Sequence, residues 1–230
     1  TYRAQPVRRV MIPKASGTGE RPLGIPTIRD RVAQTAAKLV LEPIFEADFD
    51  DAAYGYRPER SAVDAVERVH QALRQGRTQV VDADLSQYFD TIPHAELMKC
   101  LMRRISDGAV LQLIKMWLKA PVEERDGRGN RRMSGGKKST QGTPQGGVIS
   151  PLLANVYMHR FIKAFRKYGL AERYGAELVT YADDFVVLCQ HGAREALEVI
   201  RGWMTRIGLS LNARKTSVKD AWVEPFEFLG

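Results

Sequence analysis

The sequence predicts an α+β fold in which an antiparallel sheet carries helices on one face. The first indication is the order of elements in the C-terminal part, which runs strand, helix, hairpin, helix and strand. The second is composition, because 44% of the 230 residues are hydrophobic and a chain of this length can bury a substantial core. We therefore expect a folded globular protein.

The N-terminal part is predicted to begin with a hairpin. Residues 7–13 and 21–26 are two extended runs, and residues 15–20 between them have the composition of a long loop. Both runs contain proline, which predicts that both lie at the edge of a sheet. Apolar residues then recur at helical spacing over 28–40, and Pro43 is expected to end that helix.

A second helix is predicted to start at Ser61, because Ser61 and Asp64 have nearly the spacing of a capping box, and to end before Gly76. Residues 78–84 then form a short apolar strand that ends in acids. The remaining expected elements are helices at 94–104 and 109–119, a basic hairpin at 122–133, an irregular glycine-rich segment at 134–150, a helix at 151–168, two strands folded about 182–184, a helix at 193–207 and a strand at 226–229.

The charged residues are unevenly distributed. Lys and Arg number 35 against 27 Asp and Glu, and the sequence pI is about 9.6. Basic residues dominate positions 1–40, whereas positions 41–51 hold five acids and no base. A basic N-terminal face would favour a polyanionic partner, because binding to phosphates releases counterions. The alternative is a mixed surface in solvent.

The chain has only two cysteines, Cys100 and Cys189, in no C-x-x-C pair. This pattern indicates neither a disulfide framework nor a zinc site, so we expect a reducing compartment such as a bacterial cytoplasm. No apolar stretch approaches ~20 residues, and no membrane partner is expected. Because the chain starts at Thr1 without Met and stops soon after an apolar run, we expect it to be a fragment.

Two pairs of acids are the candidate catalytic groups. Asp82 and Asp84 end an apolar strand, and strand alternation directs both to one face. Asp183 and Asp184 are neighbours, which point oppositely in a straight strand, so they can serve one site only if a tight turn lies there. The predicted hairpin supplies that turn.

Clustered carboxylates repel one another unless a cation lies between them. Hard oxygen ligands without Cys or His nearby favour Mg²⁺ over zinc, and two such ions can activate a 3′-hydroxyl and stabilise a leaving pyrophosphate. The alternative is that these acids only cap strands and turns. The glycine-rich segment 142–151 favours the catalytic interpretation, because accessible glycine backbone, Gln145 and a helix start suit a nucleotide pocket.

These motifs together resemble reverse transcriptases. Tyr181-Ala182-Asp183-Asp184 is similar to the YADD box of that family, and Pro144-Gln145-Gly146-Gly147 to its motif B. The other similar segments are motif A at 84–90, the two fingers motifs at 12–26 and 54–61, motif D at 209–216 and the start of motif E at 228–230. Residues 150–155 resemble group II intron proteins more than retroviral or retron enzymes.

The resemblance implies the fingers and palm of a right-hand polymerase, with fingers at 1–77 and 93–149, palm at 78–92 and 150–230, and the thumb and maturase region absent. It also implies two Mg²⁺ ions held by Asp84, Asp183 and Asp184, with the Leu85 carbonyl as a further ligand. Asp82 is expected to orient its neighbours or cap the strand.

Further roles follow from matching positions in the same family. Lys14 and Arg21 would hold the incoming triphosphate, or serve as edge-strand charges that deter aggregation. Phe89 would exclude a ribose 2′-hydroxyl, or pack in the core. Gln145 would contact the nucleotide, and Lys215 would protonate pyrophosphate or be a surface charge. Arg57 and Arg60 would contact the template.

The implied activity is RNA-directed DNA polymerisation in group II intron mobility. The partners would be an RNA template such as the intron RNA, a DNA or RNA primer, and deoxynucleoside triphosphates. Two alternatives stay open: a non-polymerising maturase that binds intron RNA, and a CRISPR-associated or diversity-generating reverse transcriptase. The three intact acids beside Gln145, Lys14 and Arg21 favour an active enzyme.

Overall fold

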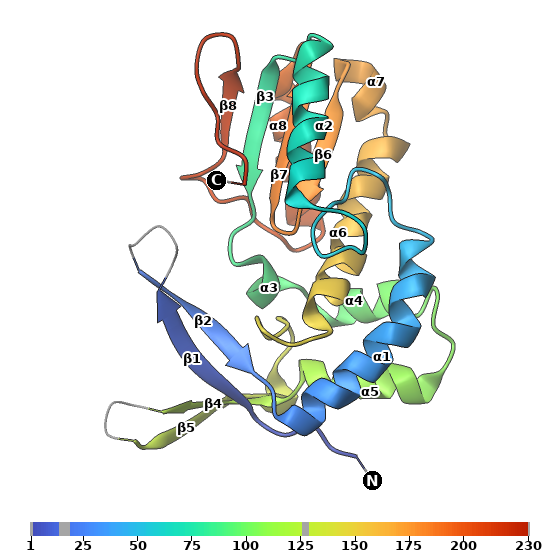
Figure 1. The fold of residues 1–230 in the computed structure, drawn as a ribbon, viewed down its shortest axis with the longest axis vertical. Coiled ribbons are helices and arrows are strands. Elements are labelled where there is room, and N and C mark those ends of the chain that lie inside the picture. Colours follow the sequence, from blue (N-terminus) through green and yellow to red (C-terminus); the bar gives the residue numbers. More distant parts are fainter. Residues whose placement is uncertain (1, 14–18, 126–128, 230) are drawn as a thin grey trace. The chain divides into compact units, whose positions relative to one another are not determined.

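The computed structural model describes residues 2–13, 19–125 and 129–229, which form two compact units. The first unit comprises Thr1–Ala47 and Phe89–Ala154, and the second comprises Asp48–Tyr88 and Asn155–Gly230. Their helices and strands are drawn in Figure 1. Residues 48–77 thus pack with the second unit, and the assignment of segments to fingers and palm stays a prediction.

The first unit contains a four-stranded sheet of order β2-β1-β4-β5. β1 (Val7–Pro13) and β2 (Glu20–Ile25) form one antiparallel pair, and β4 (Pro121–Arg125) and β5 (Arg131–Gly135) form the other. Both predicted hairpins are confirmed, while their loops at 14–18 and 126–128 lie outside the described residues.

The expectation that both N-terminal strands are edge strands is wrong for β1. β2 is an edge strand, but β1 pairs in parallel with β4 at Val7 and Arg8. Pro13 does not prevent this pairing, because it lies at the opposite end of β1, where no β4 residue needs its missing N–H group.

The helices of the first unit follow the predicted positions, with one difference. α1 (Ile28–Glu46), capped by Thr27, contains Pro43 instead of ending before it. Pro43 lies in the last turn, where it removes a single backbone hydrogen bond, and its carbonyl still accepts one from the Ala47 N–H. α4 (His94–Leu101) and α5 (Gly108–Leu118) are confirmed, and residues 136–149 contain η1 (Gly136–Lys138), an isolated bridge at Gln141 and short turns.

The second unit contains an antiparallel sheet of order β6-β7-β3-β8. The strands are β3 (Gln79–Asp84), β6 (Glu177–Tyr181), β7 (Asp184–Cys189) and β8 (Ser217–Asp220). β8 was not predicted, and the strand expected at 226–229 is wrong. Phe226, Phe228 and Leu229 pack against the apolar cluster beneath α2, while the position next to β3 is occupied by β8.

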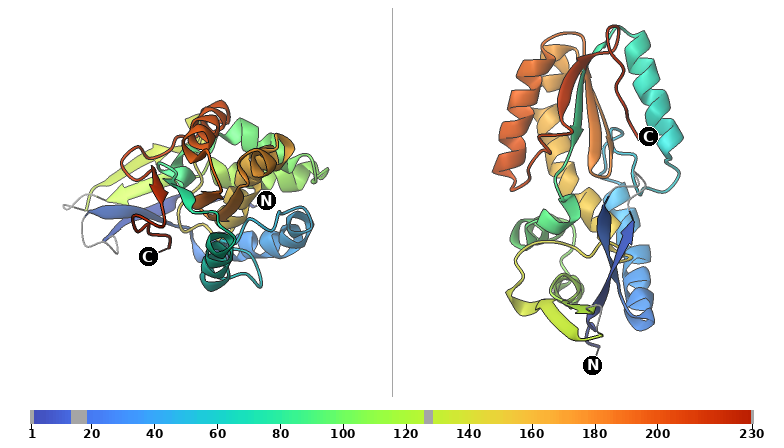
Figure 2. Two further views of the ribbon diagram at one scale, coloured as in Figure 1. Left: turned by 90° about the horizontal axis from the view of Figure 1, so that it is seen from above. Right: turned by 90° about the vertical axis from the view of Figure 1, so that its left-hand side faces the viewer.

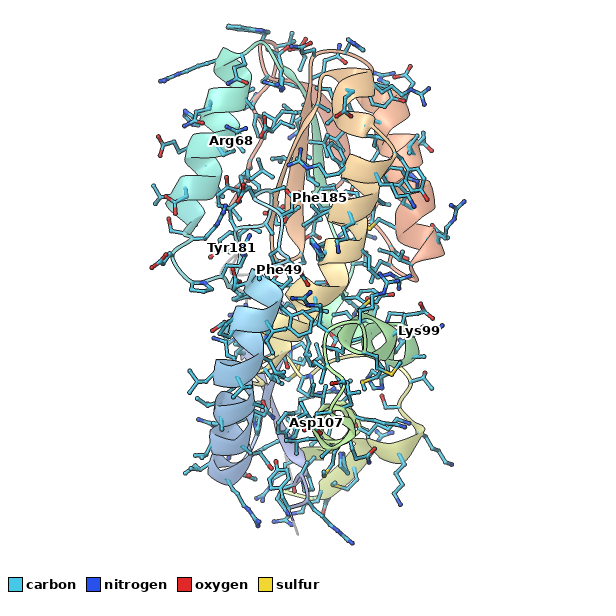
Figure 3. The ribbon with its side chains drawn as sticks, turned by 90° about the vertical axis from the view of Figure 1, so that its right-hand side faces the viewer. Phe49, Arg68, Lys99, Asp107, Tyr181 and Phe185 are labelled. Atoms are coloured by element: carbon cyan, nitrogen blue, oxygen red, sulfur yellow. The ribbon has the colours of Figure 1, made fainter. Side chains whose placement is uncertain are left out.

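The α+β class is confirmed, but helices cover both faces of this sheet instead of one (Figure 2). α2 (Ala62–Arg74) starts at the predicted Ser61 capping box and packs over Val80 and Val186. On the other face, Phe185 of β7, labelled in Figure 3, contacts Phe161 of α6 (Ser150–Lys167) at 5.2 Å between ring centroids. The fully apolar run 185–189 is the sequence signal of a strand buried on both faces.

Three helices complete the described part of the chain. α8 (Ala193–Arg206) packs on β3, β7 and β8, and its end before Gly208 is confirmed. α3 (Tyr88–Thr91) and α7 (Leu170–Tyr174) are short and were not predicted. Among the described residues, no helix is both long and apolar enough to cross a membrane.

Candidate active site

The candidate catalytic acids meet where β3 and β7 pair. Asp84 at the end of β3 lies directly opposite Asp184 at the start of β7, and Asp82 lies opposite Val186 two positions further. Because side chains alternate along a strand, Asp82, Asp84 and Asp184 share one face of the sheet. This is the face on which α2 packs, at Val80 and Val186, so the acids occupy the end of an otherwise apolar surface.

Asp183 belongs to the tight turn that the sequence required. Tyr181 pairs with Asp184, so only Ala182 and Asp183 connect β6 to β7. Ala182 has φ of 57°, a left-handed conformation that costs a non-glycine residue about 1–2 kcal/mol. The Asp183 carbonyl accepts a hydrogen bond from the Leu85 N–H at 3.0 Å, which ties the turn to the residue after Asp84.

The electrostatics of this cluster favour neutral or cation-bound acids. Burial raises the pKa of Asp184 to about 6, and the negative charges of Asp82 and Asp84 act in the same direction. Burial also raises the pKa of Asp183, with a further contribution from the charge of Asp84. Burial raises the pKa of Asp82 in turn, against the opposing charge of Lys219. A bound cation would relieve the repulsion between these groups.

Side chains that follow α8 neutralise part of this charge. The Lys215 Nζ lies 3.4 Å from the Asp84 Oδ2, so the structure brings this predicted catalytic lysine to the acids. The Lys219 Nζ lies 3.8 Å from the Asp82 Oδ2. Asn212 donates through Nδ2 to the Asp84 Oδ2 at 3.1 Å and through its backbone N–H to the Asp84 carbonyl at 2.8 Å.

Asn212 and Lys219 were missed by the sequence analysis. Asn212 lies inside the segment that resembles motif D, so its position was known, but nothing local indicated that it would reach Asp84. Lys219 belongs to the unpredicted strand β8, which pairs with β3 so that Asp82 lies opposite Ser217. Both contacts depend on long-range pairing that residue spacing does not encode.

The acids fit a hard divalent cation in donor type, since carboxylates gather here with no Cys or His among them. Within the described residues, however, no three or more His, Cys, Asp and Glu side chains are grouped to hold a metal ion. Asp84 faces Asn212 and Lys215. A shared metal site therefore requires its carboxylate to turn from these partners, and the predicted convergence of the triad stays a prediction.

The glycine-rich segment in the first unit is held by backbone hydrogen bonds and approaches the Gly24 backbone closely at Gly146. The Gln145 carbonyl accepts from the Gly24 N–H at 2.5 Å, and the Phe89 carbonyl accepts from the Thr143 N–H at 2.7 Å. Gly146 has φ of 105°, and a Cβ there would lie 2.6 Å from the Gly24 carbonyl oxygen, so only glycine fits. Gln145 itself is half-buried.

The other nucleotide-binding candidates lie in the same unit. Arg21 is exposed on β2, opposite Ile12, on the strand that contacts Gln145 through Gly24. Phe89 is 8% exposed, which fits packing in the core, and its contact with the ribose stays a prediction. Lys14 lies outside the described residues.

The two template candidates make local contacts within the second unit. Arg57 donates to the carbonyls of Asp50 and Ala53 at 2.7 and 2.9 Å, and its guanidinium lies over the ring of Phe49. Arg60 pairs with Asp51 and lies over the ring of Tyr54. These contacts stabilise the loop before α2, and the template role stays a prediction.

Comparison with known proteins identifies the family. Residues 12–230 match the family described as reverse transcriptase (RNA-dependent DNA polymerase). The chain is 36% identical to protein YkfC of Escherichia coli K12 over 265 aligned residues, covering 100% of the chain and 67% of that protein. It is 40% identical over 163 residues to the group II intron-encoded protein LtrA of Lactococcus lactis, covering 71% of the chain and 26% of LtrA.

Solved structures show the same fold at low sequence identity. One is telomerase from Candida albicans in complex with a fragment of telomeric RNA, with a TM-score of 0.76 and 14% sequence identity. The match covers 99% of this chain and 44% of the telomerase chain. Another is an apo telomerase from Candida tropicalis with the same TM-score, where the match covers 98% of this chain and 52% of the telomerase chain. The chain belongs to the reverse transcriptase (RNA-dependent DNA polymerase) family and is related to group II intron-encoded proteins.

Proposed function

We propose that this chain is the catalytic part of an RNA-directed DNA polymerase that extends a primer 3′-hydroxyl with deoxynucleotides on an RNA template, in group II intron mobility. The observation that carries the proposal is the direct pairing of Asp84 with Asp184 beside the Asp183 turn. The chain spans about a quarter of the length of LtrA, so the activity and partners of the whole protein are part of the proposal.

Asp84, Asp183 and Asp184 would hold two Mg²⁺ ions, with the Leu85 carbonyl as a further ligand. Bound ions of this type lower the pKa of the attacking 3′-hydroxyl and neutralise charge on the leaving pyrophosphate. Asp84 and Asp184 are paired at one end of the sheet, and the Asp183 turn is hydrogen-bonded to Leu85, which supports this choice of ligands.

The remaining site residues would bind and orient the substrates. Lys14 and Arg21 would hold the triphosphate, since the planar guanidinium of Arg binds phosphate through two donors. Gln145 would contact the nucleotide and Phe89 would exclude the ribose 2′-hydroxyl. Lys215, beside Asp84, would donate a proton to the leaving pyrophosphate. Arg57 and Arg60 would contact the template.

Primer extension on an RNA template with Mg²⁺ tests the activity, with two matched variants. Asp84→Asn should lower the extension rate by about 10³-fold or more, as expected for a group that acts only in catalysis. Asp82→Asn removes a carboxylate on the same strand and face but outside the triad, and it should lower the extension rate far less. Equal rates for wild type and Asp84→Asn would rule out the proposed site.

A second role in binding intron RNA is favoured by the excess of basic residues and by resemblance to intron maturases. The chain is 35% identical over 94 residues to nuclear intron maturase 2 of Arabidopsis thaliana, covering 41% of the chain. A maturase role would need the basic surface but not the acids. Asp84→Asn should then retain wild-type affinity for intron RNA while losing primer extension.

Cys189 has the character of a structural cysteine. Cys100 and Cys189 are both free, and burial raises the pKa of the Cys189 thiol to about 12. The reactive thiolate of Cys189 is therefore disfavoured, as expected of a buried structural cysteine.

A further inference from the structure

The turn that carries Asp183 lies against the backbone of Gly55. A Cβ atom on residue 55 would lie 2.5 Å from the Ala182 nitrogen and 3.1 Å from the Tyr181 carbonyl carbon. Both are backbone atoms, which cannot rotate away as a side chain does. Residue 55 therefore has to be glycine for the turn to keep this position.

Gly55 ends a short segment that extends the sheet beside β6. The Tyr54 N–H donates to the Thr180 carbonyl at 2.9 Å, and the Thr180 N–H donates to the Ala52 carbonyl at 2.8 Å. Ala53 and Thr180 form an isolated parallel bridge. The segment is thus fixed to the last residues of β6, immediately before the turn.

Asn155 of α6 also holds this segment. Its Nδ2 donates to the Gly55 carbonyl at 2.8 Å, and the residue is only 8% exposed. A buried amide with a specific backbone partner holds its position more firmly than apolar packing alone, because losing the partner would leave a buried polar group unsatisfied. A continuous set of contacts therefore runs from Asn155 through Gly55 to Ala182.

Ala182 is the part of this set that needs support. Its φ of 57° is disfavoured for alanine, and such a conformation persists only when the surroundings fix it. A turn released from it would carry Asp183 and the start of β7 to new positions. Metal ligands depend strongly on neighbours of this kind, which orient them without touching the ion.

We propose that Gly55 and Asn155 are positioning residues that hold the Ala182 turn in the conformation in which Asp183 and Asp184 bind divalent cations. This inference rests on the proposed metal site. Each acts through the backbone of the turn, Gly55 by its close approach to Ala182 and Asn155 by its hydrogen bond to Gly55.

The test is direct binding of Mn²⁺, followed through the loss of its free EPR signal. Gly55→Ala should weaken Mn²⁺ binding by about tenfold or more, in the range measured for residues that orient metal ligands. The matched control is Gly202→Ala on α8 in the same unit, where a new Cβ would meet nothing within 4 Å. The control should bind Mn²⁺ as wild type does.

Asn155→Ala provides a second test if Gly55→Ala does not fold. It removes the hydrogen bond to Gly55 without a clash and should also weaken Mn²⁺ binding. Ala182→Gly distinguishes positioning from general destabilisation, because glycine adopts positive φ readily. In the Ala182→Gly background, Asn155→Ala should cause a smaller loss of Mn²⁺ affinity than in the wild type, which two independent effects would not produce.

The possible outcomes separate the two proposals. If wild type binds no Mn²⁺, or Asp84→Asn binds it as tightly as wild type, the metal site and therefore the proposed function are wrong. If wild type binds Mn²⁺ through Asp84 but folded Gly55→Ala and Asn155→Ala bind it equally well, only the positioning role is wrong. The same holds if Asn155→Ala loses as much affinity in the Ala182→Gly background as in the wild type.

Discussion

Asp84 and Asp184 lie directly opposite each other in the register of β3 and β7. Like charges in directly opposed positions of an antiparallel pair destabilise a sheet. Apolar side chains at these two positions would extend the surface that Val80 and Val186 form beneath α2. The acids therefore cost folding free energy, as is common for groups that serve a site instead of the core.

The first prediction is that Asp184→Asn stabilises the protein when divalent cations are chelated. Because the pKa of Asp184 is raised to about 6, the folded state holds its proton more tightly than the unfolded state does. Its contribution is complete below about pH 4 and is lost as pH rises through 6. At pH 7.5 we expect a gain of about 1 kcal/mol, well below the full value of the pKa shift because Asp184 is partly in solvent.

Thermal or urea unfolding in EDTA measures this effect. The difference between Asp184→Asn and wild type should shrink below pH 4, where the carboxyl is protonated in both states. A variant that is less stable than wild type at pH 7.5 would show that the carboxylate is stabilised by its surroundings.

Asp50→Asn should have the opposite effect and destabilise the protein. Burial alone would raise the pKa of Asp50, but hydrogen bonds from Arg166 and from the Ala52 N–H outweigh it and lower the pKa. Its stabilisation is present above the ordinary Asp pKa and is lost as pH falls through the lowered value. At pH 7 we expect Asp50→Asn to cost about 1 kcal/mol, since Arg166 is half-exposed.

Asp51→Asn is the matched control for this prediction. Its carboxylate also pairs with an arginine, Arg60, but is 89% exposed, so the change should be within about 0.5 kcal/mol. Denaturant unfolding at pH 7 and at pH 2.5 measures both variants. If Asp50→Asn lowered the free energy of unfolding as much at pH 2.5 as at pH 7, the stabilisation would not come from the ion pair with Arg166.

The elements that could be predicted are those that depend on residues close together in the sequence. The Ser61 capping box, the strand ending at Asp84 and the turn at Ala182 depend on neighbours within a few residues and were predicted. β8 and the contact of Thr180 with Ala52 depend on partners more than a hundred residues away. Nothing in residues 217–220 or 52–55 distinguishes them from loop until the partner strand is present.

The candidate site divides in the same way. The acids could be found because their residue types and spacing carry the chemistry. Asn212, Lys219, Gly55 and Asn155 act through contacts made only in the folded chain, so their residue types alone indicated no role. The continuation of α1 through Pro43 could not be predicted either, because whether a helix tolerates proline in its last turn depends on the folded structure around it.

Phe89→Ala should let ribonucleotides compete better with deoxynucleotides, because it removes the ring proposed to exclude the 2′-hydroxyl. It should also destabilise the protein by about 3–5 kcal/mol, since Phe89 is 8% exposed. Phe45→Ala is the control, since Phe45 is a similarly buried phenylalanine of the same unit outside the nucleotide motifs. Single-nucleotide incorporation below the melting temperature measures the preference for deoxynucleotides over ribonucleotides. An equal change of this preference in Phe89→Ala and Phe45→Ala would assign Phe89 to packing.

Arg21→Ala should raise the KM for deoxynucleotides and leave RNA affinity nearly unchanged, because its proposed partner is the incoming triphosphate. Arg8→Ala is the matched variant, since Arg8 is also exposed on the N-terminal hairpin. If Arg8 contacts template phosphate, its loss should lower the salt slope of RNA binding by about 0.7–0.9. A loss of RNA affinity in Arg21→Ala with an unchanged KM would contradict the triphosphate assignment.

The most direct test of the proposed metal site is a crystal structure of the protein grown with Mn²⁺, in which anomalous scattering locates the ions. We expect anomalous peaks about 2.0–2.4 Å from carboxylate oxygens of Asp84, Asp183 and Asp184, with the Asp84 side chain turned away from Asn212 and Lys215. Well-ordered carboxylates that keep their present contacts, with Mn²⁺ absent from all three, would contradict it.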